Sequence, residues 1–210
     1  EIAQSTVCHG HMPVKYWMHN NMITINGRKM GKSYNNVIKL TEMFSGNHPL
    51  LEQAYKPMTI RFFILQTHYR STLDFGNEAL QAAEKGLKRL MSAYAILQGF
   101  KPEGFAAVST GTEQEQLLNA AEPQYAVAMD DDLSTAKALS YMFEAVPLIN
   151  SLAEGKIPST AVSAESIIKF QALWKLYIEE IFGLQAEAES NDELLDGVMQ
   201  LLLEMRAQAK

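Results

Sequence analysis

The segment TINGRKMGKSYNN, residues 24–36, contains two lysines three residues apart, Lys29 and Lys32. Its Gly-Lys-Ser triplet also ends the phosphate-binding loop of many ATPases, but that loop has four residues between its first glycine and the triplet. Only three residues separate Gly27 from Gly31, too few for the backbone to wrap the phosphates. This spacing excludes an ATPase loop. Two interpretations remain: an ordinary solvated loop, or a segment whose ammonium groups act on a negatively charged ligand.

The two lysines are expected to follow a strand and a tight turn. Residues 22–25 are Met-Ile-Thr-Ile, and the Asn-Gly that follows supplies the positive φ angles of a two-residue hairpin turn. Residues 59–69 indicate a compact apolar helix, and residues 77–98 give the strongest helix prediction. Six apolar residues of that second helix recur at intervals of three and four and predict one buried stripe: Leu80, Ala83, Leu87, Leu90, Tyr94 and Leu97.

Later helices are marked by caps and prolines. Thr112 with Glu115 forms a capping box before one helix, and a serine or threonine at 134–135 is expected to cap the next. Each helix contains a proline, Pro123 and Pro147, which is expected to kink or interrupt it. A third helix has a predicted apolar stripe of Ile167, Phe170, Trp174, Tyr177 and Ile181.

The fold class that these patterns predict is mainly α. A helical bundle is expected, preceded by a small α+β segment that carries the lysine loop. A last bundle helix is expected over residues 190–205, because Ser190 and Glu193 form a second capping box.

Composition narrows the class of protein. With 47% hydrophobic and 20% charged residues and no apolar run of bilayer length, neither disorder nor a membrane span is favoured. The single cysteine, Cys8, excludes an intrachain disulfide and favours a cytoplasmic location. A net charge of −6 argues against nucleic-acid binding by bulk electrostatics but permits a local basic patch.

Longer motifs point to one family. Residues 29–33, Lys-Met-Gly-Lys-Ser, resemble the KMSKS signature of class I aminoacyl-tRNA synthetases, with Gly31 in place of the first serine. Four segments occur in the order seen in cysteinyl-tRNA synthetases: EIAQS at 1–5, YWMHNNMITINGRKMGKS at 16–33, RFFILQTHYRSTLDF at 61–75 and MDDDLSTAKAL at 129–139. By this resemblance the chain is identified as a C-terminal fragment of a member of that family.

The resemblance implies an enzyme that uses ATP to attach L-cysteine to tRNA(Cys) through cysteinyl-adenylate. Lys29 and Lys32 would be catalytic, and residues 29–33 would bind ATP, which enters with Mg²⁺. Their ammonium groups would close on the charge that develops on departing pyrophosphate, with Met30 as an apolar anchor. Glu1 would be the last ligand of a catalytic zinc ion whose other ligands lie upstream, so this fragment alone is expected to hold neither zinc nor ATP.

The same resemblance divides the chain in two. Residues 1–75 would be the end of a class I catalytic domain, with the KMSKS-like loop and a connecting region. Residues 76–210 would be a DALR domain of the anticodon-binding kind, truncated at its C-terminus. The fragment alone is expected to be inactive, and the protein is expected to be a cytoplasmic monomer.

Several charged residues have two interpretations. Arg70 could contact tRNA or tie the two halves of the chain together, and Lys88 and Arg89 could contact tRNA or form an ordinary solvated face. The aspartates at 130–132 could bind magnesium, but they more simply favour the positive end of the next helix.

Two other functions remain as alternatives. A cysteine ligase of the kind used in mycothiol synthesis makes the same adenylate but transfers cysteine to a small amine. A non-catalytic tRNA-binding fragment would keep only the helical domain.

Overall fold

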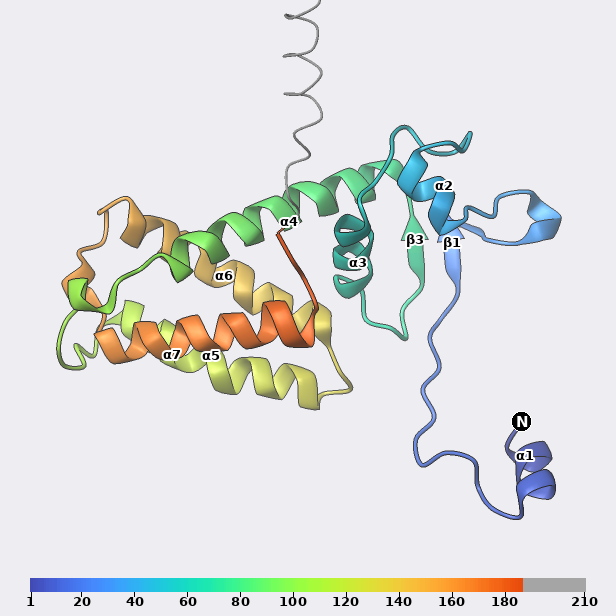
Figure 1. Cartoon of the computed structure of the whole chain (residues 1–210), viewed down its shortest axis with the longest axis horizontal. Coiled ribbons are helices and arrows are strands. Elements are labelled where there is room, and N and C mark those ends of the chain that lie inside the picture. The colour runs from blue at the N-terminus through green and yellow to red at the C-terminus, as the bar shows by residue number, and fades with distance from the viewer. Residues whose placement is uncertain (187–210) are drawn as a thin grey trace, which may run out of the picture.

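The computed structural model describes residues 1–186 of the chain. It is mainly helical, as predicted, with a small sheet next to the lysine loop (Figure 1). The α-helices are α1 (Ile2–His9), α2 (Leu40–Ser45), α3 (Pro57–Leu65), α4 (Asn77–Gln98), α5 (Glu113–Asp130), α6 (Thr135–Ala153) and α7 (Ala164–Lys175). Short helical turns are η1 (Lys32–Tyr34), η2 (Pro102–Gly104), η3 (Ser159–Ala161) and η4 (Leu176–Ile181). None of the helices in this described part has the length and apolar character needed to cross a membrane.

The predicted hairpin is confirmed. Strands β1 (Ile23–Ile25) and β2 (Arg28–Lys29) pair antiparallel through a turn in which Asn26 has φ 50° and Gly27 has φ 75°. Strand β3 (Leu73–Phe75) pairs parallel with β1 on its other side, so the strand order is β2-β1-β3. The hairpin is therefore attached to the body of the protein through β3.

Helix α4 has the predicted bounds, and all six residues of its apolar stripe are buried. In Figure 1 the helix runs from the bundle to the region above α3, and it contacts both α3 and α6. Helix α5 packs against α6 and α7, which completes the bundle. Because α4 contributes to both groups of helices, one continuous core connects the segment around the hairpin with the bundle.

Four local predictions are corrected. The first apolar helix ends at Leu65 and does not extend to residue 69. Pro123 and Pro147 lie inside continuous helices and interrupt neither of them, while a kink at either proline stays a prediction. At the start of α6, Ser134 makes no side-chain cap hydrogen bond, and the Thr135 hydroxyl donates instead to the Leu65 carbonyl at 2.7 Å.

The fourth correction concerns the third stripe. Residues of η4 form a turn of π-helix, which contains more residues per turn than an α-helix and so shifts the inward face. Ile178 and Phe182 are consequently buried, whereas the predicted Ile181 is exposed. The helix expected over residues 190–205 lies outside the described residues.

Candidate functional site

The lysine loop is fixed by backbone and amide hydrogen bonds. The Met30 amide donates to the Ile23 carbonyl at 3.0 Å, which extends the hairpin pairing. The Asn36 side chain accepts from the Gly31 amide at 2.9 Å and donates to the Lys29 carbonyl at 3.0 Å. Asn36 is buried, and its amide therefore closes the loop from within.

Side chains of the loop divide into an anchor and a charged face. Met30 is half-buried and packs against the core, whereas Lys29, Lys32 and Ser33 are exposed. Among residues 1–186 neither lysine has an ion-pair partner. Arg28 lies over the ring of Tyr34 at 4.9 Å and adds a third cation to this side of the hairpin. Such a group of unpaired cations can stabilise an anion with several charges.

The turn of the hairpin rests on β3. One carboxylate oxygen of Asp74 accepts from the Thr24 hydroxyl at 2.5 Å and from the Gly27 amide at 2.8 Å. Asp74 and Asn36 therefore hold the loop from two sides. Neither residue was predicted from the sequence, although an aspartate between the two apolar residues of β3 and a second asparagine after the loop are visible in it.

Gly31 has an extended backbone, with φ −173°, which any residue can adopt. A Cβ atom added at this position would lie 3.2 Å from Cδ2 of Tyr34. The Tyr34 ring therefore lies close to the place that a side chain at position 31 would occupy. The backbone conformation does not itself require glycine there.

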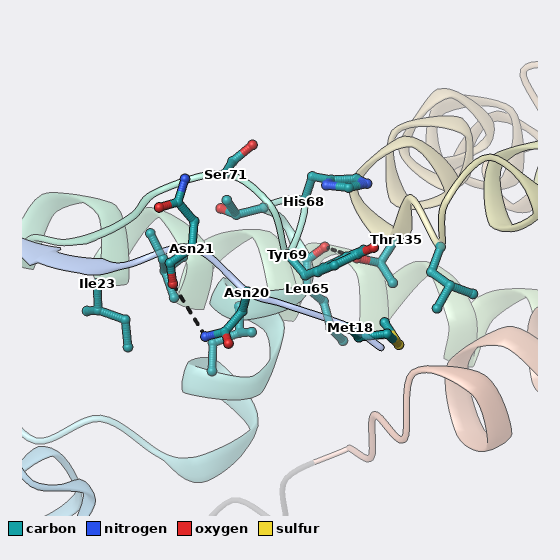
Figure 2. Close-up of a pocket in the computed structure, with 13 residues that line it drawn as sticks. Met18, Asn20, Asn21, Ile23, Leu65, His68, Tyr69, Ser71 and Thr135 are labelled. Atoms are coloured by element: carbon teal, nitrogen blue, oxygen red, sulfur yellow. Dashed lines mark hydrogen bonds between the residues drawn. The ribbon is translucent and has the colours of Figure 1, made fainter. Parts of the chain in front are cut away.

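A separate cavity of about 400 Å³ lies between the extended segment that leads into β1, the end of α3 and the start of α6 (Figure 2). Its lining is mainly apolar and includes Met18, Ile23 and Leu65, with His68 and Tyr69 on one side. Neither Lys29 nor Lys32 is among its lining residues. The cavity and the charged face of the loop are therefore different surfaces.

Arg70 contacts Asp132, which lies in the turn between α5 and α6. Its Nε atom is 2.9 Å from one carboxylate oxygen and its Nη2 atom is 3.3 Å from the other. The Tyr69 hydroxyl donates to Asp132 at 2.6 Å. Hydrogen bonding to Tyr69, together with the attraction of Asp132, raises the pKa of the Arg70 guanidinium. Of the aspartates before α6, Asp132 faces this turn and Asp131 is 3.9 Å from Lys137 in the first turn of α6, and their effect on the N-terminus of that helix stays a prediction.

Lys88 and Arg89 lie on the exposed side of α4. The Lys88 ammonium is 3.5 Å from Glu84, and the Arg89 guanidinium lies 5.9 Å from the centre of the Phe143 ring. Both interactions leave the charge accessible to solvent. Contact of these residues with tRNA stays a prediction.

Glu1 is exposed at the start of α1. No group of three or more His, Cys, Asp or Glu side chains within residues 1–186 is arranged to hold a metal ion. The residues present therefore do not form a zinc site by themselves, and Glu1 supplies at most one ligand.

Comparison with known proteins identifies two domain families in the chain. Residues 1–85 match the family described as the class I (C) tRNA synthetase catalytic domain, and residues 124–187 match the DALR domain. The chain is thus built from parts of a class I aminoacyl-tRNA synthetase. It is 47% identical over 213 residues to a cysteine–tRNA ligase of Parabacteroides distasonis, 49% over 213 residues to that of Phocaeicola vulgatus and 38% over 214 residues to that of Thermus thermophilus. It belongs to the cysteinyl-tRNA synthetase family. Each alignment covers 100% of this chain and 41% of the relative.

Proposed function

We propose that this chain forms part of an enzyme that attaches L-cysteine to tRNA(Cys), with cysteinyl-adenylate as the intermediate. The complete synthetase in this proposal has the length of the relatives named above, and this chain is its matching part. Support comes from the names of those relatives and from the two domain matches. The main structural support for a role of this chain in the reaction is its pair of lysines, which are exposed and have no ion-pair partner among the described residues and lie on a hairpin anchored to the core.

The lysine loop would act in adenylate formation. When the cysteine carboxylate attacks the α-phosphorus of ATP, the bond to pyrophosphate breaks and negative charge accumulates on the leaving group. Lys29 and Lys32 would donate charge-assisted hydrogen bonds to that group, because their ammonium groups are exposed and have no competing carboxylate among the described residues. Magnesium bound to ATP would share this neutralisation.

Other loop residues would support this step. Met30 would hold the loop against the core while the lysines on either side reach toward the phosphates. The Ser33 hydroxyl is exposed beside Lys32 and is a further donor to a phosphate oxygen, and Gly31 completes the ATP-binding segment. The loop thus combines a half-buried apolar anchor with exposed charged side chains.

Glu1 would be one ligand of a zinc ion that binds the substrate thiol in the complete synthetase. A zinc ion suits this task because thiolate is a good ligand for it and a serine hydroxyl is a poor one. No group of three or more His, Cys, Asp or Glu side chains among residues 1–186 could complete such a site.

The bundle would bind tRNA. The DALR match covers residues 124–187, and exposed Lys88 and Arg89 on α4, with Arg70 near the α5–α6 turn, are candidates for contacts with the RNA backbone. The names of the relatives favour tRNA as the acceptor over a small amine and over a binding-only fragment. The protein is proposed to act as a cytoplasmic monomer.

The test is Lys32→Ala in the complete synthetase, measured as cysteine-dependent exchange of pyrophosphate into ATP. Removal of a charge donor that acts in the transition state is expected to slow exchange by about 100-fold or more. The dissociation constant for cysteine should change less than twofold or so, since the lysine touches only the phosphates in this mechanism.

Lys101→Ala is the matched control, because Lys101 is exposed next to η2 at the other end of the bundle from the hairpin (Figure 1). It should exchange pyrophosphate at the unaltered rate. Equal losses in exchange and in cysteine affinity for Lys32→Ala would contradict the role assigned to this lysine.

A further inference from the structure

The α5–α6 turn has an unfavourable backbone conformation. Asp132 and Leu133 are consecutive non-glycine residues with φ 58° and φ 56°, a region that side chains with a Cβ atom rarely occupy. Two such residues in succession persist only where the surroundings favour them. Here the conformation directs the Asp132 side chain toward the turn that follows α3.

Asp132 is the acceptor for three neighbouring residues of that turn. Its carboxylate accepts from Tyr69 and Arg70, and its backbone carbonyl lies 3.1 Å from Nε2 of His68. These contacts join positions 62 to 64 residues apart in the sequence. The Asp131 carboxylate, one residue earlier, forms an ion pair with Lys137 of α6 at 3.9 Å, so among the described residues its side-chain contact lies within the bundle.

The other side of the same turn is bonded to the chain that enters the hairpin. The Asn21 amide donates to the Tyr69 carbonyl at 3.0 Å, and the Asn21 side chain donates to the Arg70 carbonyl at 2.9 Å. Figure 2 shows Asn21 and Tyr69 on adjacent segments beside the cavity. Two residues after Asn21 the chain becomes β1.

The turn also leads directly into β3, which supports the hairpin. Leu73 donates its amide to the Met22 carbonyl at 3.2 Å, and β3 then runs parallel to β1. Asp74 in β3 holds Thr24 and the turn at Gly27. The bundle and the lysine loop are therefore connected, from Asp132 onward, by hydrogen bonds that are joined through short stretches of backbone.

We infer that Asp132 is a positioning residue for the lysine loop, acting through the turn at 68–71 and strand β3. Its carboxylate fixes this turn relative to the bundle, and the turn fixes the strands on which Lys29 and Lys32 are mounted. Tyr69 is its nearest partner in this role. The expected effect on catalysis rests on the proposed function. The structural connection between Asp132 and the hairpin does not, because it follows from the hydrogen bonds described above.

The first measurement is independent of catalysis. Hydrogen exchange of the Met30 and Gly31 amides, both bonded within the hairpin, is compared between Asp132→Asn and the matched Asp131→Asn in the complete synthetase. Asp132→Asn should lower the protection of these two amides by about tenfold and leave the α6 amides unchanged. Asp131→Asn should leave both groups unchanged. Equal protection in the two variants, or a loss confined to α5 and α6, would overturn the inference.

The second measurement is cysteine-dependent pyrophosphate exchange at saturating cysteine and ATP. Asp132→Asn and Tyr69→Phe should each slow the reaction by about tenfold, with little change in KM for cysteine, because a small displacement of catalytic groups is costly. The double variant should be no slower than the slower single variant, since both remove the same connection. Rates equal to the unaltered enzyme, or losses that multiply, would overturn the inference.

Lys32→Ala in the same assay separates the two proposals. If Lys32→Ala is slow and Asp132→Asn is not, the positioning role fails and the proposed function stands. If Lys32→Ala exchanges normally, the proposed function fails, and the hydrogen-exchange result alone decides the mechanical connection.

Discussion

The hairpin and the bundle are stabilised in different ways. The bundle has a continuous apolar core in which the rings of Phe170 and Trp174 and the side chain of Ile149 are almost completely buried. The hairpin contributes few side chains to that core and is held by hydrogen bonds to Asn36 and Asp74. Burial of apolar area supplies most of the stability of the bundle, whereas directional bonds fix the geometry of the hairpin with little total stabilisation.

This difference fits the two tasks proposed above. A loop that closes on a developing charge, as proposed for the lysine loop, must open again, so its closed state can be favoured by only a few kcal/mol or so. A bundle that binds tRNA, as proposed, must keep its shape. Substitutions in the bundle should therefore change the free energy of unfolding, and those in the hairpin should change reaction rate with little effect on unfolding.

The largest effect is expected for Trp174→Ala. The side chain is fully buried between α7 and its neighbours, so its removal leaves a cavity. The free energy of unfolding of the bundle, followed by circular dichroism in urea, should fall by about 3–5 kcal/mol. Ile168→Ala, on the exposed side of the same helix, is the control and should change it by under about 0.5 kcal/mol. Similar losses in the two variants would show that burial does not decide stability here.

A second test concerns Glu115, a carboxylate inside the bundle. Its Oε1 atom accepts from Ser163 and Ser166, and its Oε2 atom accepts from Ser109 and from backbone amides in the loop before α5. The hydrogen bond from Ser163 has the largest effect on this carboxyl and holds its pKa well below the ordinary value of 4.5. Hydrogen bonds from Ser109, Gly111 and Thr110 lower the pKa further, whereas burial opposes the shift. Its charged form is therefore favoured by folding.

The sign of the pH dependence follows from this shift. A carboxyl whose pKa is lower in the folded state stabilises the fold fully above its unfolded pKa, and the contribution is lost as pH falls through the folded value. Between about pH 6 and about pH 3 the urea midpoint of the unaltered protein should fall more steeply than that of Glu115→Gln. Glu113→Gln, exposed in the same first turn of α5, should keep the steep dependence. Parallel curves for the Glu115 variant and the unaltered protein would contradict this assignment.

In the hairpin, Asn36→Ala removes both amide hydrogen bonds that close the loop. Each bond contributes about 1 kcal/mol, so the closed loop should be populated less and pyrophosphate exchange should slow by about tenfold. The free energy of unfolding of the bundle should stay within about 0.5 kcal/mol of its original value. Asn47→Ala, an exposed asparagine after α2, is the control. A loss of bundle stability with an unchanged exchange rate would show that Asn36 stabilises the bundle and does not fix the geometry of the loop, which would contradict the difference between the two regions.

The structural features that were predicted correctly from the sequence are those that depend on residues close together in the chain. The Asn26-Gly27 turn and the apolar stripe of α4 depend on neighbours within a few residues, and both were correct. The contacts of Asp74 and Asp132 join segments about 50 to 60 residues apart, and no spacing within one segment predicts them. The turn of π-helix in η4 was not predicted either, because a strict helical period cannot show where an extra residue enters a turn.

The smallest effect is expected for Gly31→Ser, which introduces the serine usual in the KMSKS signature. The extended backbone at this position accepts serine without strain, so the only cost is the 3.2 Å approach of the new Cβ atom to the Tyr34 ring. Tyr34 is exposed and can move by a few tenths of an ångström, although this weakens its contact with Arg28. Pyrophosphate exchange should therefore change by no more than about twofold, and Tyr34→Ala combined with Gly31→Ser should remove even that difference. A tenfold or larger change in either direction would mean that the glycine controls the mobility of the loop, and the hairpin would then depend on backbone freedom as well as on Asn36 and Asp74.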